Sequence, residues 1–521
     1  MRLTAVAGAP HVAVVGAGVG GLSAAIRLAA AGAHVTVFER HAAPGGKMRE
    51  VEVDGRRLDA GPSVLTMPWV FEELFAAAGA RMADLVTLLP VEPACRHFFP
   101  DGSRLDLFND PERSREAIRA FAGEGAARGF DALRAHGRRI FGIVREPFME
   151  SPVPTLAAML HPSRLRLIGQ FLQLDANRTL WKALEAMFPD DRLRTLYGRY
   201  ATYNGSSPFS CPATLSVIVH VEQEFGISVV KGGMARLAGA LAEVARRLGV
   251  TVRTGAEVER VVVEHGRAAG VVVAGERFDA DAVVVNGDAL QLHRRLLAGE
   301  RGAKKAARRV EAIEPSFSAF VVLAVADVGD APLAHHNVFF SRDYRREFDQ
   351  LGDGKRPPDD PTVYLCAQDR APGAAPPADG RERHLLLTNA PALDAAHPID
   401  WTLEGAECRR RLDETLARHS VTLRRSVERS VTPADFEALF PSSRGSLYGG
   451  SSNARTAAFE RPTNRVPGTR GLYLVGGSAH PGAGVPMVAL SGRIASSLAM
   501  AELGIAPPPL PAATSGGTST R

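Results

Sequence analysis

Apolar residues near the N-terminus follow a pattern that predicts a strand, a helix and a second strand. Residues 12–15 and 35–38 are short apolar runs, which are typical of buried parallel strands. Between them, apolar residues recur at steps of three and four from Leu22 to Ala29, and Gly32 is expected to end this helix. A similar order returns at the C-terminus, where the apolar run 472–475 precedes a glycine-rich turn and an apolar helical face.

The pattern changes twice between these ends. From about 68 to 225 it is largely helical, and residues 226–288 return to alternating strands and helices. Residues 300–425 mix strands near 319–325 and 363–367 with loops rich in proline, glycine and aspartate. In the first of these regions helices are expected over 112–121, 130–144, 156–174 and 179–188.

Three glycines after the first strand form the pattern G-x-G-x-x-G, at Gly16, Gly18 and Gly21, and Glu39 ends the second strand. In a dinucleotide site the first glycine makes a tight turn, the second lets the backbone approach the pyrophosphate, and the third packs helix on strand. The helix N-terminus faces the phosphates, and the acidic residue accepts hydrogen bonds from a ribose. The sequence therefore predicts a dinucleotide site.

The C-terminal unit indicates which dinucleotide binds. An NAD site is normally complete within the first half of a chain, whereas FAD needs a second region for its isoalloxazine ring. The helix that follows the turn 476–486 suits this role, because its positive end stabilises the negative charge of a reduced flavin. No second G-x-G-x-x-G occurs, so electrons are expected to leave the flavin for a quinone or oxygen.

These features predict an α/β fold in which a Rossmann-like FAD-binding domain is joined to a discontinuous α+β substrate domain. A length of 521 residues exceeds one ordinary core, which also favours two domains. The FAD-binding domain is expected to combine 10–95, 226–299 and 426–505, and the substrate domain 96–225 and 300–425, before a disordered tail at 506–521.

Composition and charge fit a globular protein with a modest basic excess. Apolar residues make up 45% and charged residues 23%, and the formal net charge is +5. No nucleic-acid partner is expected. The basic excess suits attraction to an anionic membrane surface. The amphipathic segment 161–174 could lie on a bilayer or cover a core, and a basic cluster could serve the membrane or be a solvated helix face. That cluster comprises Lys304, Lys305, Arg308 and Arg309.

The four cysteines are far apart and form no C-x-x-C pair, so neither a metal site nor a dithiol couple is expected. They suit a reducing compartment. The N-terminus carries no signal-peptide pattern, and no uncharged apolar run is long enough to span a membrane. A cytoplasmic location is expected.

The sequence resembles the bacterial phytoene-desaturase-type carotenoid oxidoreductases, within the FAD amine-oxidase superfamily, from about residue 10 to 503. The resemblance rests on VVGAGVGGLSAAIRLAAAGAHVTVFER, PGGKM, DAGPSVLT, VVKGGMARLAGAL, LAHHNVFFSRDYRREFD and GLYLVGGSAHPGAGVPMVALSGR. Within the family, 198–213 and 361–370 look most like the 1-hydroxycarotenoid 3,4-desaturase (methoxyneurosporene dehydrogenase) branch.

This resemblance implies which residues contact FAD. Val258 would lie on the adenine side, and no catalytic residue is implied beyond His480 as a weak candidate, which could equally stabilise its turn. The N-terminal FAD contacts would be Gly16, Gly18, Gly21, Glu39, Arg40, Gly46, Lys47, Gly61 and Pro62. The C-terminal contacts, beside the isoalloxazine, would be Gly477, Pro486, Met487 and Val488.

The resemblance also implies a reaction, the insertion of a double bond into an acyclic carotenoid that carries a 1-hydroxy or 1-methoxy group. A carbon beside the polyene would give a hydride to flavin N5, and the adjacent carbon would lose a proton. Because the substrate dissolves in the bilayer, peripheral association with the inner membrane is implied. The alternatives are a multi-step phytoene desaturase, a carotenoid isomerase, and a non-catalytic lipid-binding escort protein of the same fold.

Overall fold

The first half of the fold is built on a five-stranded parallel sheet. The computed structural model describes residues 8–153 and 172–508. The strand order is β19-β13-β1-β2-β9, which brings a strand from the end of the chain into the sheet begun at its start. These strands are β1 (His11–Val15), β2 (His34–Glu39), β9 (Thr251–Thr254), β13 (Ala282–Val285) and β19 (Leu472–Leu474).

Both faces of this sheet are covered, which explains why its strands are apolar runs rather than alternating ones. Val12 and Val14 face the helices α1 (Val19–Ala30), α9 (Ala235–Arg247) and α16 (Val485–Leu503). Ala13 faces an antiparallel sheet on the other side. That sheet consists of β10 (Val258–Glu264), β11 (Arg267–Val273) and β12 (Glu276–Asp279).

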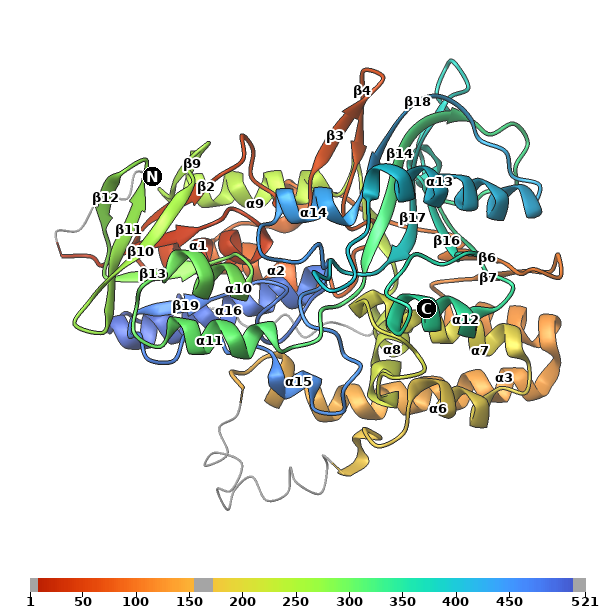
Figure 1. Ribbon diagram of the computed structural model, residues 1–521, viewed down its shortest axis with the longest axis horizontal. Coiled ribbons are helices and arrows are strands. Elements are labelled where there is room, and N and C mark those ends of the chain that lie inside the picture. The colour runs from red at the N-terminus through yellow and green to blue at the C-terminus, as the bar shows by residue number, and fades with distance from the viewer. Residues whose placement is uncertain (1–7, 154–171, 509–521) are drawn as a thin grey trace.

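The second half is built on a seven-stranded sheet, seen on the right in Figure 1. Its order is β18-β14-β17-β16-β15-β6-β7, and all neighbours are antiparallel except β6 and β15. The strands are β6 (Cys95–Phe98), β7 (Arg104–Leu107), β14 (Ser318–Asp327), β15 (His336–Phe339), β16 (Val363–Ala367), β17 (Glu382–Ala390) and β18 (Arg424–Val431).

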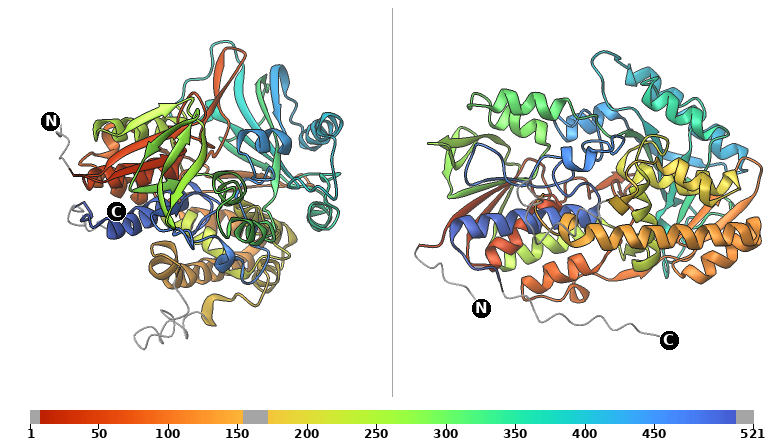
Figure 2. Two further views of the ribbon diagram at one scale, coloured as in Figure 1. Left: turned by 60° about the vertical axis from the view of Figure 1, so that its left-hand side comes forward. Right: turned by 90° about the horizontal axis from the view of Figure 1, so that it is seen from below.

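Helices cover both faces of the seven-stranded sheet. On one face α13 (Trp401–Arg418) packs against Phe320 and Val322. On the other face lie five helices and the hairpin β3–β4, and α3 runs along the outside of this half when the molecule is seen from below (Figure 2). The helices are α3 (Pro111–Val144), α6 (Leu180–Met187), α7 (Asp191–Gly198), α8 (Val217–Phe225) and α12 (Tyr344–Gly352), and the hairpin strands are β3 (Glu50–Val53) and β4 (Arg56–Asp59).

Shorter elements complete the chain. Among the described residues, no helix has the length and apolar character needed to span a bilayer. The short α-helices are α2 (Trp69–Ala77), α10 (Ala289–Gln291), α11 (Ala303–Glu311), α14 (Pro433–Leu439) and α15 (Ala457–Glu460). The short strands are β5 (Leu88–Pro90) and β8 (Ser228–Val230), and the other helical turns are η1 (Met82–Asp84), η2 (Arg145–Met149), η4 (Leu172–Leu174), η5 (Arg199–Asn204), η6 (Ala213–Ser216), η7 (Leu292–Leu296) and η8 (Gln368–Arg370).

The helical pattern of the middle region is confirmed in part. The two helices expected over 112–121 and 130–144 form one element, α3, which is interrupted where Gly123 takes a non-helical φ of 84°. The helix expected over 179–188 is α6, whose first turn is capped by the Thr179 hydroxyl. Most of the expected helix 156–174 lies outside the described residues.

Candidate cofactor and substrate site

The glycine-rich turns from the two ends of the chain meet beside Asn286. This residue follows β13, and its backbone N–H donates to the Val15 carbonyl at 2.7 Å. A Cβ atom added to Gly18 would lie 2.6 Å from Asn286 Nδ2, and one added to Gly20 would lie 2.8 Å from Asn286 Oδ1 and 3.1 Å from Val488 Cγ1. The N-terminal fingerprint and the start of α16 therefore line one site.

Two positions of the fingerprint accept only glycine. Gly16 has a φ of +94°, which L side chains rarely adopt, and its N–H donates to the Phe38 carbonyl at 2.7 Å. A Cβ on Gly21 would lie 2.1 Å from the Gly16 carbonyl oxygen. These are the tight turn and the close helix–strand packing that a dinucleotide cradle requires.

Glu39 and Arg40 lie at the end of β2, next to this turn. Glu39 is buried, and its two carboxylate oxygens accept from the backbone N–H groups of Ala17 at 2.7 Å and His41 at 2.8 Å. Arg40 Nη1 is buried and has no partner among the described residues. A buried donor without a partner is costly, so a ligand oxygen at this place would be stabilising.

Lys47 lies next to the same turn. Its residue has accessible surface, yet the surrounding protein desolvates its ammonium group and lowers the pKa to about 8, against the opposing effect of Asp288. Its Nζ donates to the Leu447 carbonyl at 2.6 Å. A cation in this position fits the negative pyrophosphate of FAD.

The loop 59–63 connects this region to the seven-stranded sheet, through Gln368 and Tyr364. Asp59 caps the start of α9, because its carboxylate accepts from the N–H groups of Met234 at 2.6 Å and Ala235 at 3.1 Å. A Cβ on Gly61 would lie 1.9 Å from the Lys47 carbonyl oxygen. Gly61 is therefore held directly against the backbone of Lys47, whereas the predicted contact Gly46 lies against Gly18.

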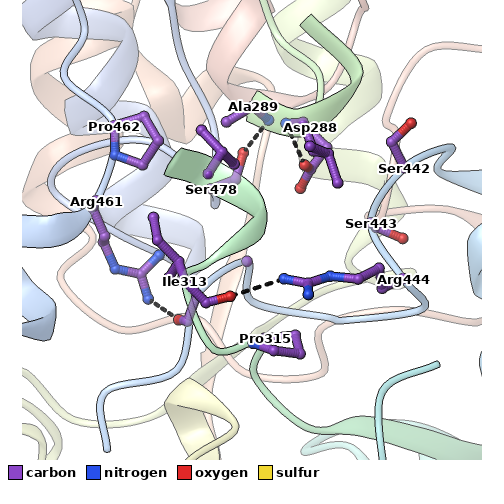
Figure 3. Close-up of a pocket in the computed structure, with 14 residues that line it drawn as sticks. Asp288, Ala289, Ile313, Pro315, Ser442, Ser443, Arg444, Arg461, Pro462 and Ser478 are labelled. Atoms are coloured by element: carbon purple, nitrogen blue, oxygen red, sulfur yellow. Dashed lines mark hydrogen bonds between the residues drawn. The ribbon is translucent and has the colours of Figure 1, made fainter. Parts of the chain in front are cut away.

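The C-terminal turn is fastened by a buried arginine. Arg461 donates through Nη1 to the carbonyls of Gly477 at 2.7 Å and Tyr448 at 3.1 Å, and through Nη2 to that of Gly450 at 2.8 Å. Figure 3 shows Arg461 beside a pocket whose other walls include Asp288, Arg444 and Ser478. The turn that was predicted to flank the isoalloxazine is thus tied to the loop 448–450.

The start of α16 continues this turn. Pro486 lies in the first turn of α16, where the lack of an N–H costs nothing. Met487 and Val488 follow it and are partly buried against the first core. No acidic residue lies in this first turn, so the positive end of the helix dipole is not neutralised there.

His480 holds the C-terminal turn in place. Its Nε2 lies 2.8 Å from the Ser151 carbonyl, and its own carbonyl accepts from Asn464 Nδ2 at 2.9 Å and Ser491 Oγ at 2.7 Å. Burial lowers the pKa of the imidazole, so it is neutral at pH 7. These contacts favour a structural role over proton transfer.

The predicted adenine-side contact Val258 and the pair His335 and His336 are all buried. Val258 is buried at the start of β10, in the same core as Phe38. His335 and His336 are buried with Cys366, and their potential ligand atoms lie within 4.8 Å of one another. Burial raises the pKa of the Cys366 thiol to about 12, so it stays protonated and contacts His335 Nε2 at 3.6 Å.

Other charged residues lie either in ion pairs on the sheet or on the surface. Asp369 and Arg370 each join the sheet through an ion pair, with Arg383 at 2.6 Å and Glu382 at 2.8 Å. The four basic residues Lys304, Lys305, Arg308 and Arg309 are exposed on α11.

Sequence reasoning missed Asn286, Asp288 and Arg461 as parts of this site. Asn286 and Asp288 do carry a signal, because polar residues after a buried parallel strand lie at the edge where such sheets bind ligands. Arg461 carries none, since its role depends on carbonyls 11 to 16 residues away in the sequence.

Three comparisons bear on what this site does. The model of the flavin containing amine oxidoreductase family matches residues 19–500. A hydroxyneurosporene desaturase from Rubrivivax gelatinosus is 42% identical over 517 residues, which is 98% of this chain and 97% of the relative. One from Cereibacter sphaeroides is also 42% identical, over 95% of this chain and 98% of its own. An oxidoreductase structure from Methanosarcina mazei, 18% identical, matches the fold with a TM-score of 0.61 over 93% of this chain and 99% of its own.

Proposed function

The chain belongs to the flavin containing amine oxidoreductase family, and we propose that it is an FAD-dependent desaturase of acyclic carotenoids with a hydroxyl or methoxy group at C1. The predicted FAD cofactor and the predicted fold of the amine-oxidase and phytoene-desaturase superfamily are confirmed. The product would be the 3,4-desaturated carotenoid.

One observation carries the proposal, the near full-length similarity to two hydroxyneurosporene desaturases. The geometry supports it, because the Gly16–Gly21 turn and the start of α16 face one another across Asn286 and so suit the two halves of FAD. The unpartnered Arg40 Nη1 and the cation of Lys47 add the donors that a pyrophosphate or ribose needs.

We propose the following residues as FAD contacts. Gly16, Gly18, Gly21, Glu39 and Arg40 would hold the adenosine half with Val258, whereas Gly46, Lys47, Gly61 and Pro62 would lie along the phosphates and flavin. Gly477, Pro486, Met487 and Val488 would flank the isoalloxazine. The domain division at 10–95, 226–299 and 426–505 against 96–225 and 300–425 follows the same assignment.

Bound FAD supplies the acceptor for the hydride that leaves the substrate carbon. The chain itself positions a substrate whose reacting atoms have no polar handle, and it keeps water away from them. The aromatic residues around the second core suit this task, for example Phe209, Phe348 and Tyr344. The proton from the adjacent carbon needs no strong side-chain base, because the polyene delocalises the positive charge.

We also propose that the protein docks on the surface of the inner membrane, where its substrate is dissolved. The exposed cations of α11 support this, since each basic residue near an anionic surface contributes about 1 kcal/mol. The amphipathic segment 161–174 lies mostly outside the described residues, and its docking role stays a prediction.

A substrate comparison tests the proposed function. Purified protein with FAD, bound to lipid vesicles, would be given hydroxyneurosporene, neurosporene and phytoene separately. We expect the absorption of hydroxyneurosporene to shift to longer wavelength and its mass to fall by two hydrogens. Conversion of phytoene alone would replace the proposal by phytoene desaturation, and a shift without a change of mass would indicate an isomerase. A colourless protein that takes up no FAD would indicate an escort protein.

A further inference from the structure

Arg199 is a partly buried cation that lacks an ion-pair partner among the described residues. It begins the turn η5, and none of the described residues forms a hydrogen bond with its guanidinium group. Instead, its Cζ lies 5.7 Å from the ring centre of Tyr203 and 5.5 Å from that of Tyr364. Part of the surface of Arg199 is accessible, which leaves room for a ligand beside it.

The groups around Arg199 are neutral phenols. Burial raises the pKa of Tyr203, Tyr344 and Tyr364 well above 10, so all three hydroxyls keep their protons. Arg199 attracts the carboxylate of Glu222 but forms no ion pair with it, and this carboxylate accepts from the Tyr200 hydroxyl at 2.6 Å. A desolvated guanidinium with unused N–H donors is expensive unless a ligand brings an acceptor.

Tyr364 connects this cation to the predicted flavin side of the site. Its hydroxyl lies 2.6 Å from Ser63 Oγ and 2.8 Å from His336 Nδ1. Ser63 directly follows Gly61 and Pro62, and Gly61 packs against the backbone of Lys47. Tyr364 therefore contacts Arg199 through its ring and Ser63 through its hydroxyl, and Ser63 belongs to the loop that we propose for FAD.

We propose that Arg199 donates a hydrogen bond to the oxygen at C1 of the carotenoid and so selects oxygenated end groups over hydrocarbon ones. This inference rests on the proposed function and names its specificity determinant. The aromatic rings beside Arg199 suit the polyene, and the guanidinium supplies a strong donor among them.

The chemistry of the substrate sets where such a donor must lie. In a 3,4-desaturation the C1 oxygen is only three bonds from C3, so the two atoms are less than about 4 Å apart. The residue that binds this oxygen must therefore adjoin the place where the substrate meets the flavin. Arg199 satisfies this requirement through Tyr364 and Ser63.

The type of hydrogen bond separates Arg199 from its polar neighbours. A guanidinium only donates, so it binds a methoxy oxygen as well as a hydroxyl. Glu222 and a neutral His336 nitrogen would accept from a hydroxyl and would reject a methoxy group. We therefore expect hydroxyneurosporene and methoxyneurosporene to be converted with kcat/KM values within about tenfold of each other.

Substitution of Arg199 tests the proposal directly. In vesicle-bound holoenzyme, Arg199→Met is expected to lower kcat/KM for hydroxyneurosporene about 10- to 100-fold while leaving the value for neurosporene within about threefold. The dissociation constant of hydroxyneurosporene, measured by its quenching of flavin fluorescence, is expected to rise in parallel. Arg345→Met is the matched control, because Arg345 also covers an aromatic ring, Phe209, but is exposed and paired with Asp349.

The outcomes separate this inference from the function on which it rests. Wild-type protein that converts neither oxygenated carotenoid would remove the proposed function itself. Only the role of Arg199 would be overturned if the wild type is active but Arg199→Met keeps the same ratio of kcat/KM for hydroxyneurosporene and neurosporene. Rejection of methoxyneurosporene by the wild type would overturn that role as well. Should Arg199→Met lose FAD, Arg199→Leu serves instead, because it also removes the donor, and a ratio in it equal to that of the wild type would count against the proposal.

Discussion

At the scale of single residues, the site is marked by charges that burial leaves incompletely compensated. Lys47 and Asp288 attract one another, and burial shifts the pKa of each toward its neutral form while this attraction opposes the shift. Arg40 and Arg199 also keep N–H donors free of described partners. Groups of this kind are costly in a stable interior, so their presence indicates ligands that complete them.

The affinity for FAD is expected to depend on pH through Lys47. Its pKa of about 8 in the free protein means that the ammonium loses its proton above pH 8. The FAD phosphates would raise that pKa in the complex, so binding keeps the proton. Affinity should therefore be constant below pH 8 and fall by up to about tenfold per pH unit above it. Titration of apoprotein with FAD at pH values from about 6.5 to about 9.5, followed by flavin fluorescence, measures this pH dependence, because the range brackets the pKa of Lys47.

Substitution of Lys47 should remove this dependence. The groups that face its ammonium are Asp288, the carbonyls of Ser446 and Leu447, and the ring of Phe440 at 5.3 Å. Lys47→Met is expected to weaken FAD binding about tenfold at pH 7 and to flatten the profile. Lys231→Met, at an exposed lysine, is the control. A steep decline above pH 8 that persists in Lys47→Met would assign the titration to another group.

At the scale of elements, the cofactor site depends on how closely α16 approaches α1. Gly492 lies where α16 crosses α1, and a Cβ there would be 2.7 Å from both the Gly20 carbonyl oxygen and Ser23 Cβ. One residue earlier, Ser491 Oγ donates to the His480 carbonyl at 2.7 Å and so ties the helix to its own N-terminal turn. Contact between these helices is what brings the two glycine-rich turns together.

A methyl group at Gly492 is expected to separate the two helices. Gly492→Ala should lower the free energy of unfolding by about 1–3 kcal/mol, because the backbone of α1 cannot move away cheaply. It should also reduce the FAD content of the purified protein. Chemical denaturation and the ratio of flavin to protein absorbance measure both effects.

Gly239→Ala in α9 is the matched control for this change. Nothing lies within 4 Å of a Cβ added at Gly239, which is exposed on its helix. Helix propensity alone predicts that this variant gains about 0.5–1 kcal/mol. If Gly492→Ala were as stable and as yellow as the wild type, the close contact between α1 and α16 would not be needed for the site.

The elements that apolar periodicity determines could be predicted from the sequence. The strands β1, β2, β13 and β19 and the helices α1 and α16 fall where the pattern places them, because strands buried on both faces leave continuous apolar runs. The pairing of β6 with β15 could not be predicted, since both are four-residue strands more than 200 residues apart. Arg199 could not be singled out within the segment 198–213 either, because an arginine in a helical stretch is usually a solvated surface residue.

At the scale of the whole molecule, the chain closes one cofactor site from its two ends. The parallel sheet places β19 next to β13 and β13 next to β1, so residues from the start, middle and end of the sequence meet beside Asn286. Arg493 of α16 forms ion pairs with Glu73 of α2 and with Glu150, the residue after η2, both at 2.9 Å. The seven-stranded sheet, drawn from 95–107, 318–390 and 424–431, carries Tyr364 to the loop 59–63, where its hydroxyl lies 2.6 Å from Ser63 Oγ.

This architecture predicts how electrons leave the enzyme. The chain carries one dinucleotide fingerprint, at Gly16, Gly18 and Gly21, and it is committed to FAD, so no second fingerprint offers a site for a nicotinamide. Under strictly anaerobic conditions, the vesicle-bound holoenzyme is expected to form about one desaturated product per flavin and then stop. A membrane-soluble quinone or oxygen should restore repeated turnover, because either could reach the flavin by the route from the membrane that we propose for the substrate. NAD⁺ and NADP⁺ serve as the control acceptors and should leave the yield at a single turnover. Sustained turnover with a nicotinamide alone would show that the electrons leave by a route the single fingerprint does not provide.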